Sequence, residues 1–126
     1  MKVVDYLERD DALFDHVLHR DHCLVHESRG MIVKDLSLLQ SGRKMEDMVI
    51  IDNKVTSYAL NLENGIPIKD FIGDRQDREL KQLTMYLMSR ILNAKDVRAV
   101  IKEDFLDTNM LISKAKQFGL GPPPAK

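Results

Sequence analysis

The sequence has little of what several classes of protein require. It contains a single cysteine, Cys23, so no internal disulfide can form, and it has no tryptophan and only 6% aromatic residues. No apolar run approaches the roughly 20 residues of a membrane-spanning helix, so we expect no membrane span. The 19 Lys and Arg residues face 20 Asp and Glu residues, for a net charge of −1. Because this balance offers no net basic face, we expect no direct binding to nucleic acid.

What is present is typical of one globular domain. The chain has 126 residues, of which 44% are hydrophobic and 31% charged. Its first dozen residues include four acids and resemble neither a secretory signal nor a mitochondrial presequence. We therefore expect a nuclear or cytoplasmic location for the chain as given.

Hydrophobic patterns predict the elements of the first half. Apolar residues on one side of residues 1–14 indicate a helix, and the β-branched character of residues 17–26 indicates a strand. A second strand over residues 31–33 follows a turn at Gly30, which predicts a hairpin. Residues 34–39 are expected to form a short helical turn.

The strongest strand pattern lies in the middle of the sequence, at Met48–Ile51. These four apolar residues do not alternate with polar ones, which predicts a strand covered on both faces, as in a parallel sheet. A further short strand is predicted over residues 66–68, where Pro67 favours a strand end or an edge.

Three helices are predicted in the remainder. Asp74 is positioned to cap the first, over residues 75–92, and Asp96 to cap the second, which runs to Phe105. A third helix is expected to begin at Asp107 or Thr108 and to end near Phe118, before a proline-rich tail.

Residue types and positions suggest where chemistry could occur. Asp52 and Asn53 directly follow the buried strand, and ligands of open α/β sheets bind beyond the carboxyl ends of strands. Their oxygens suit a hard cation such as Mg²⁺, although the pair could simply turn the chain. Lys34 follows another predicted strand and could neutralise a phosphate as a point charge, or be an ordinary surface lysine. Arg20 could be a forked phosphate ligand or an exposed strand residue.

A zinc site is a weaker interpretation of the histidines around Cys23. Alternation along a strand would place His19 and Cys23 on one face, and His22 and His26 on the other. Thiol chemistry at Cys23 would also need an orienting acid, and the pattern names none. Cys23 is more typical of a residue that fills the core.

Several short blocks, taken in order and spacing, carry a resemblance over about residues 1–101. They are Arg20–His26, Val33–Ser37, Val49–Asn53 with Ser57 and Tyr58, Glu63–Ile68, and Asp77–Leu80. Together they resemble the C-terminal half of the FCP/SCP-type phosphatase domain. This is the NLI-interacting-factor family of small phosphatases of the RNA polymerase II C-terminal domain, within the haloacid dehalogenase superfamily.

The resemblance implies an α/β fold. We expect a partial haloacid-dehalogenase-like (Rossmann-like) sheet with a β-hairpin insertion and C-terminal helices, which lacks its N-terminal central strand. Residues 1–106 would form the C-terminal part of the phosphatase domain, and residues 107–126 a helical extension with the proline-rich tail.

The resemblance also implies a reaction and a role for each site residue. The reaction is Mg²⁺-dependent dephosphorylation of phosphoserine or phosphothreonine in a protein or peptide, through an aspartyl-phosphate. Lys34 resembles the lysine that stabilises the phosphoryl charge, and Asp52 the acid that supports the site. Asn53 resembles a ligand of the Mg²⁺ ion, and Arg20 the arginine at the substrate phosphate.

The sequence departs from the family at its catalytic signature. It contains no Asp-x-Asp, the pair that supplies nucleophile and acid/base, and Ser28 is the only Ser or Thr before Lys34. Lys54-Val55 also stands where the family has Ser-Pro. We therefore expect the sequence to begin within the domain, the chain to be inactive alone and Mg²⁺ to bind weakly. The alternative is a non-catalytic protein-binding member, such as a mitochondrial presequence import module, with a mitochondrial location.

The missing central strand has a structural consequence. Without it, Met48–Ile51 has no pairing partner along one edge, and an open apolar edge favours association. We therefore expect self-association or a partner chain.

Overall fold

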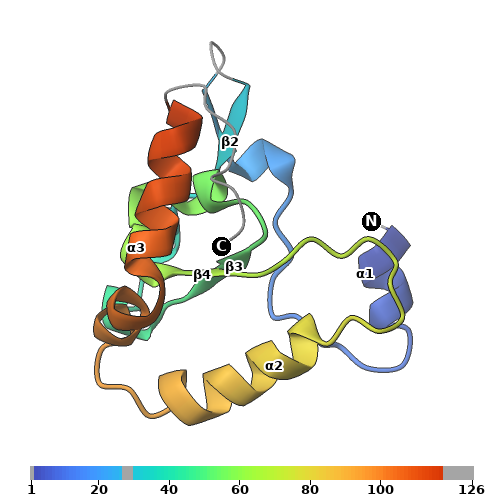
Figure 1. Cartoon of the computed structure of the whole chain (residues 1–126). Helices are drawn as coiled ribbons and strands as arrows, with labels where there is room; N and C mark the ends of the chain where they lie inside the picture. Colours follow the sequence, from blue (N-terminus) through green and yellow to red (C-terminus); the bar gives the residue numbers. More distant parts are fainter. Residues whose placement is uncertain (1, 27–29, 118–126) are drawn as a thin grey trace.

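Two parallel strands form the centre of the molecule, which we describe from a computed structural model covering residues 2–26 and 30–117. Strand β3 (Ile50–Asp52) pairs with β4 (Gly65–Pro67), so that Ile50 lies opposite Gly65 and Asp52 opposite Pro67 (Figure 1). Within the described residues, no strand lies along the other edge of β3. The expected mixed α/β architecture is confirmed at this level, whereas a Rossmann-like sheet is not visible in the described part.

The crossover between the two strands is a 3₁₀ segment, η5 (Val55–Asn64), which bends at Tyr58 and Asn61. It holds Tyr58, whose side chain is completely buried. A Cβ atom added to Gly65 would lie 2.0 Å from the Tyr58 ring, so glycine is required for the ring to cover the start of β4.

Two apolar clusters flank the strands. One contains Ile50, Tyr58 and Leu36, and the other joins Ile66 of β4 to Ile91 and Ile101 from the C-terminal helices. Ile51, by contrast, remains 37% exposed. The expected cover on both faces of this strand is therefore incomplete in the described structure.

An antiparallel hairpin, β1 (Leu24–His26) with β2 (Met31–Val33), confirms the predicted pairing. Gly30 has a φ of 60°, the left-handed conformation expected for the turn. The predicted strand over residues 17–26 is wrong before Leu24, because Arg20–His22 form a 3₁₀ turn, η1, in which the Cys23 N–H donates to the Arg20 carbonyl.

Helix α1 (Lys2–Leu7) is much shorter than the predicted helix over residues 1–14. Two of its apolar side chains, Val3 and Leu7, remain 64% and 48% exposed, so burial gives little support to a longer helix. Beyond the helix, the Glu8 carboxylate accepts hydrogen bonds from the backbone N–H groups of Leu13 and Phe14, which turns the chain.

Helix α2 (Glu79–Tyr86) begins later than predicted and continues into a π-helical turn, Leu87–Ile91. Asp74 does not cap it, because its carboxylate accepts from the backbone of Gln76 in a separate turn. Asp77 instead accepts from the N–H of Glu79, the first residue of the helix.

Helix α3 (Val97–Gln117) is continuous, so the predicted break between Phe105 and Asp107 is wrong. Asp96 accepts a hydrogen bond from the backbone N–H of Arg98, which confirms the predicted cap. The expected end near Phe118 and the proline-rich tail lie outside the described residues. Across residues 2–26 and 30–117, no helix combines the length and apolar character needed to cross a membrane.

Candidate functional site

Lys34 and Asp52 meet where β2 and β3 end. The Lys34 ammonium lies 2.6 Å from Oδ2 of Asp52, and the two side chains are 49% and 7% exposed. The structure thus brings together two residues to which the family resemblance assigns roles at one site. A buried carboxylate beneath a half-exposed ammonium leaves positive charge accessible from solvent at the end of the sheet.

Local backbone contacts hold this pair in place. Oδ1 of Asp52 accepts from the Lys54 N–H at 2.8 Å, a turn that follows directly from the end of β3. The backbone N–H of Lys34 donates to the carbonyl of Ser57 at 2.7 Å, which ties the residue to η5. Both oxygens of Asp52 are therefore occupied within the protein.

Tyr58 lies behind the pair and contributes to its electrostatics. Burial, together with the negative charge of Asp52, raises the pKa of the Tyr58 phenol well above its ordinary value. The phenol therefore stays protonated and donates to Oδ1 of Asn109 at 3.1 Å. The sequence pattern did not indicate Asn109, because a polar residue on a helix carries no signal for a partner 51 residues away.

Asn53 turns toward a residue that the sequence analysis did not consider. Its side-chain Nδ2 donates to Oδ1 of Asp70 at 2.8 Å, across 17 residues of sequence. Within the described structure, Asn53 Oδ1 accepts no hydrogen bond. Asn53 thus presents an amide oxygen that has no hydrogen bond among the described residues, while its nitrogen faces Asp70.

Arg20 does not join the site in this structure. It lies exposed on the 3₁₀ turn rather than in the predicted strand, and its guanidinium has no hydrogen bond or ion pair among the described residues. Its proposed role at a substrate phosphate therefore stays a prediction.

The oxygen groups here match the chemical preference of Mg²⁺ but are few. Across the described residues, no cluster of three or more His, Cys, Asp and Glu side chains is arranged to bind a metal ion. Asn53 Oδ1 is a hard ligand, and Mg²⁺ typically has few protein ligands and keeps several waters. The site fits Mg²⁺ in donor type, and weak binding is the physical expectation.

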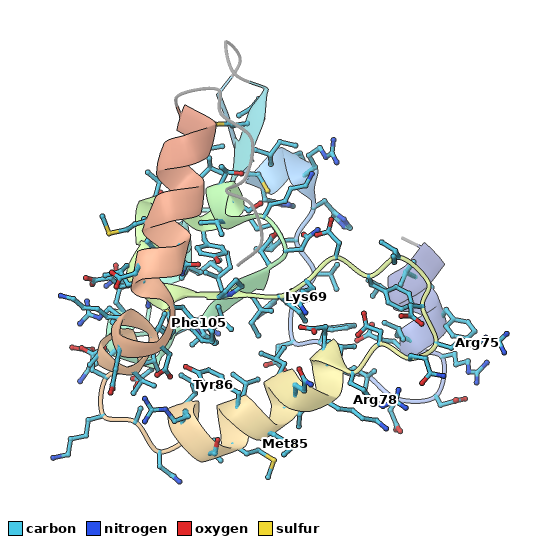
Figure 2. All side chains as sticks on the ribbon, viewed as in Figure 1. Lys69, Arg75, Arg78, Met85, Tyr86 and Phe105 are labelled. Atoms are coloured by element: carbon cyan, nitrogen blue, oxygen red, sulfur yellow. The ribbon has the colours of Figure 1, made fainter. Side chains whose placement is uncertain are left out.

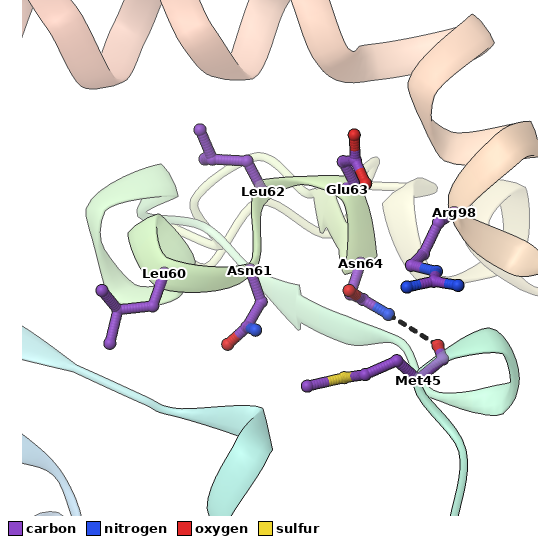
Figure 3. A pocket seen from close by; sticks show the side chains of 7 residues that line it. All are labelled: Met45, Leu60, Asn61, Leu62, Glu63, Asn64 and Arg98. Atoms are coloured by element: carbon purple, nitrogen blue, oxygen red, sulfur yellow. Dashed lines mark hydrogen bonds between the residues drawn. The ribbon is translucent and has the colours of Figure 1, made fainter.

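A hollow of about 250 Å³ lies elsewhere, between η5 and the start of α3 (Figure 3). Its polar groups serve the fold: Asn64 donates to the carbonyls of Met45 and Met48, at 2.9 and 2.8 Å. Arg98 is paired with Asp96 at 2.9 Å. No side chain that resembles the family's site residues lines this hollow.

Comparison with known proteins identifies the class to which this fold and site correspond. The sequence model of the NLI interacting factor-like phosphatases matches residues 1–98. The chain belongs to this family, as the resemblance predicted.

Several relatives are similar to this chain over most of its length. CTD small phosphatase-like protein 2 of Dictyostelium discoideum is 42% identical over 98 residues, and CTD small phosphatase-like protein 3 of Caenorhabditis elegans is 36% identical over 104. These matches cover 78% and 82% of this chain but 16% and 35% of the relatives. Nuclear envelope morphology protein 1 of Schizosaccharomyces pombe is 38% identical over 85 residues, 68% of this chain and 17% of that protein. The chain thus spans between 16% and 35% of the length of these relatives.

Proposed function

We propose that this chain forms the charge-stabilising part of a Mg²⁺-dependent phosphoserine and phosphothreonine phosphatase site. The observation that carries the proposal is the contact between Lys34 and Asp52 at the carboxyl end of β3, 2.6 Å long. Family membership supports it, since the relatives are named as small phosphatases. The proposed reaction would pass through an aspartyl-phosphate on the family's Asp-x-Asp, which this sequence does not contain.

Each residue of the site has a physical task in this proposal. The Lys34 ammonium, half exposed above Asp52, would neutralise the oxygens of the incoming phosphoryl group, and Asp52 would fix its position. A bound Mg²⁺ ion would supply further positive charge to the same oxygens, and Asn53 would hold it through its free amide oxygen. Arg20, which lies outside the site in the described structure, would bind the substrate phosphate if it takes the role that the family resemblance implies.

The absent Asp-x-Asp decides what the chain does alone. Lys34, Arg20 and Asn53 can stabilise charge, but none of them can form the phosphoenzyme. We therefore expect the purified chain to bind inorganic phosphate without hydrolysing p-nitrophenyl phosphate in the presence of Mg²⁺. Phosphate binding followed by ³¹P NMR, with Lys34→Met as the variant that loses it, tests the proposal. Hydrolysis that disappears in Asn53→Ala would contradict it, because another group would then be the nucleophile.

The second candidate is a protein-binding member of the family without chemistry. The exposure of Phe71 and Ile72, at 74% and 85%, favours it. A peptide supplied with and without phosphoserine distinguishes the two. A phosphatase site would prefer the phosphorylated form, whereas a binding module of this second kind would bind both equally.

We propose a nuclear or cytoplasmic location and an associating chain. The relative named nuclear envelope morphology protein 1 supports the nuclear choice. The open edge of β3 supports association with a second copy or a partner chain, because unpaired backbone groups there can pair with another strand.

A further inference from the structure

The segment that connects β4 to α2 reaches the candidate site through Asp70. The Asp70 carboxylate accepts a hydrogen bond from the Asn53 side chain. The neighbouring Lys69 forms an ion pair with Glu79, at 3.8 Å. Figure 2 shows Lys69 at the beginning of this segment, which then leads away from the strands to the start of α2. Phe71 and Ile72 are 74% and 85% exposed, so burial of these two residues does not hold the segment.

The chemistry of the contact determines which end of the amide faces Asp70. An ionised carboxylate only accepts hydrogen bonds, so it pairs with the Nδ2 end of Asn53 and repels the Oδ1 end. An exposed asparagine side chain without such a partner can turn either end toward a ligand. The 2.8 Å contact removes that freedom and reserves Oδ1 for a positively charged group.

We propose that Asp70 is a positioning residue that holds the Asn53 amide with its oxygen available to the cation. The inference rests on the proposed function, because it assigns Asp70 a role only if Asn53 is a cation ligand. Asp70 acts through Asn53 and is not itself placed in contact with substrate.

The test uses the full chain with asparagine side chains labelled with ¹⁵N, and with the Asn53 amide assigned through Asn53→Ser. Without metal, we expect one Asn53 amide proton to be slow in exchange with water, and Asp70→Ala to abolish this protection. Titration with magnesium chloride alone, followed at the same amide signal, then measures the apparent affinity for the cation. We expect Asp70→Ala to weaken the apparent affinity by about 3- to 10-fold, the effect of losing one charge-assisted hydrogen bond.

Glu79→Gln is the matched control, because it removes the same charge from the end of the same segment without touching Asn53. Glu79→Gln should leave amide exchange and magnesium affinity unchanged within about twofold. If its effect equalled that of Asp70→Ala, the loss of a negative charge, and not the contact with Asn53, would explain the result. Magnesium binding that is equal in wild type and Asp70→Ala would overturn the inference and leave the proposed function standing. An Asn53 amide that does not respond to magnesium in the wild type would refute the cation site and the inference together.

Asp70 is exposed, so Asp70→Ala should fold. Its melting temperature is expected within about 2 °C of wild type. A larger loss would show that the contact serves stability, and would also count against a positioning role.

Discussion

Tyr58 and Asn109 are hydrogen-bonded across 51 residues, in a part of the core where neither side chain is exposed to solvent. The same asparagine donates through Nδ2 to the carbonyl of Gly65 at 3.0 Å. One buried amide therefore joins helix α3 to the crossover η5 and to the start of β4. Because Tyr58 also lies close to Asp52, this contact helps to hold the residues behind the candidate site in place.

Asn109→Ala should destabilise the protein by about 2–3 kcal/mol, because it leaves the Tyr58 hydroxyl and the Gly65 carbonyl buried without a partner. Urea denaturation followed by circular dichroism measures the loss. Asp107→Ala, on the exposed side of the same helix, is the control and should change stability by less than about 0.5 kcal/mol. Equal effects of the two changes would mean that α3 is not anchored through Asn109.

Lys34→Met should abolish phosphate binding and lower the free energy of unfolding by about 1–3 kcal/mol. The stability loss follows because the Asp52 carboxylate, which is 7% exposed, loses its ammonium partner; the half-exposed position of Lys34 limits the loss. Lys54→Met removes the same charge close by, and Lys54 contacts Asp52 only through its backbone N–H. If the Lys54 variant weakened phosphate binding as much as the Lys34 variant, general charge would explain the binding.

We expect Asp104 to contribute to stability in a way that depends on pH. Its hydrogen bond from Arg90, with that from Tyr86, holds the pKa of the Asp104 carboxyl below its usual range. A depressed pKa in the folded state stabilises the protein above the unfolded pKa, and this stability is lost as the pH falls through the folded value. The gap in melting temperature between wild type and Asp104→Asn should therefore be largest at neutral pH and narrow at strongly acidic pH. A difference in melting temperature that is the same at every pH would contradict this prediction. Asp107→Asn is the control, because it makes the same charge change on the same helix.

The open edge of β3 predicts association that depends on concentration. The Asp52 carbonyl accepts from the Ile68 N–H at 3.3 Å, so Asp52 faces β4. By the alternation of a parallel pair, the backbone groups of Ile51 face the open edge. Sedimentation velocity over a range of concentrations should detect oligomers, and Ile51→Lys should shift them toward the monomer.

Leu60→Lys is the control for this experiment. It places the same charge on an apolar side chain that is 59% exposed but lies on η5, away from the strand edge. A clean monomer of the wild type with a cooperative melting transition would refute association through the edge.

Local patterns in the sequence were sufficient for features that depend on neighbouring residues. The hairpin follows from two apolar runs and a glycine that adopts a positive φ, and the cap at Asp96 from one side chain reaching the next turn. The roles of Lys34 and Asp52 at one site were implied by the family resemblance, and both residues lie at strand ends, Lys34 directly after β2 and Asp52 as the last residue of β3. The metal, phosphate and catalytic roles of these residues remain predictions.

Tertiary structure decided the features that depend on distant partners. Helix α3 passes through residues 105–107 because one of its sides is buried at Ile101, at Phe105 against Tyr86, and at Asn109 against Tyr58. Helix α1 is short, and its side chains Val3 and Leu7 gain little from burial, at 64% and 48% exposed.

The partners of Asn53 and Tyr58 likewise emerged only from the fold. A hydrogen bond between residues 17 or 51 positions apart leaves no periodic trace in sequence, because its free energy depends on which groups the folded chain brings together and removes from water. The sequence by itself determined the family, the approximate positions of the strands and the residues able to carry charge. Only the packed structure showed that Asp70 accepts a hydrogen bond from Asn53 and that Asn109 accepts one from Tyr58.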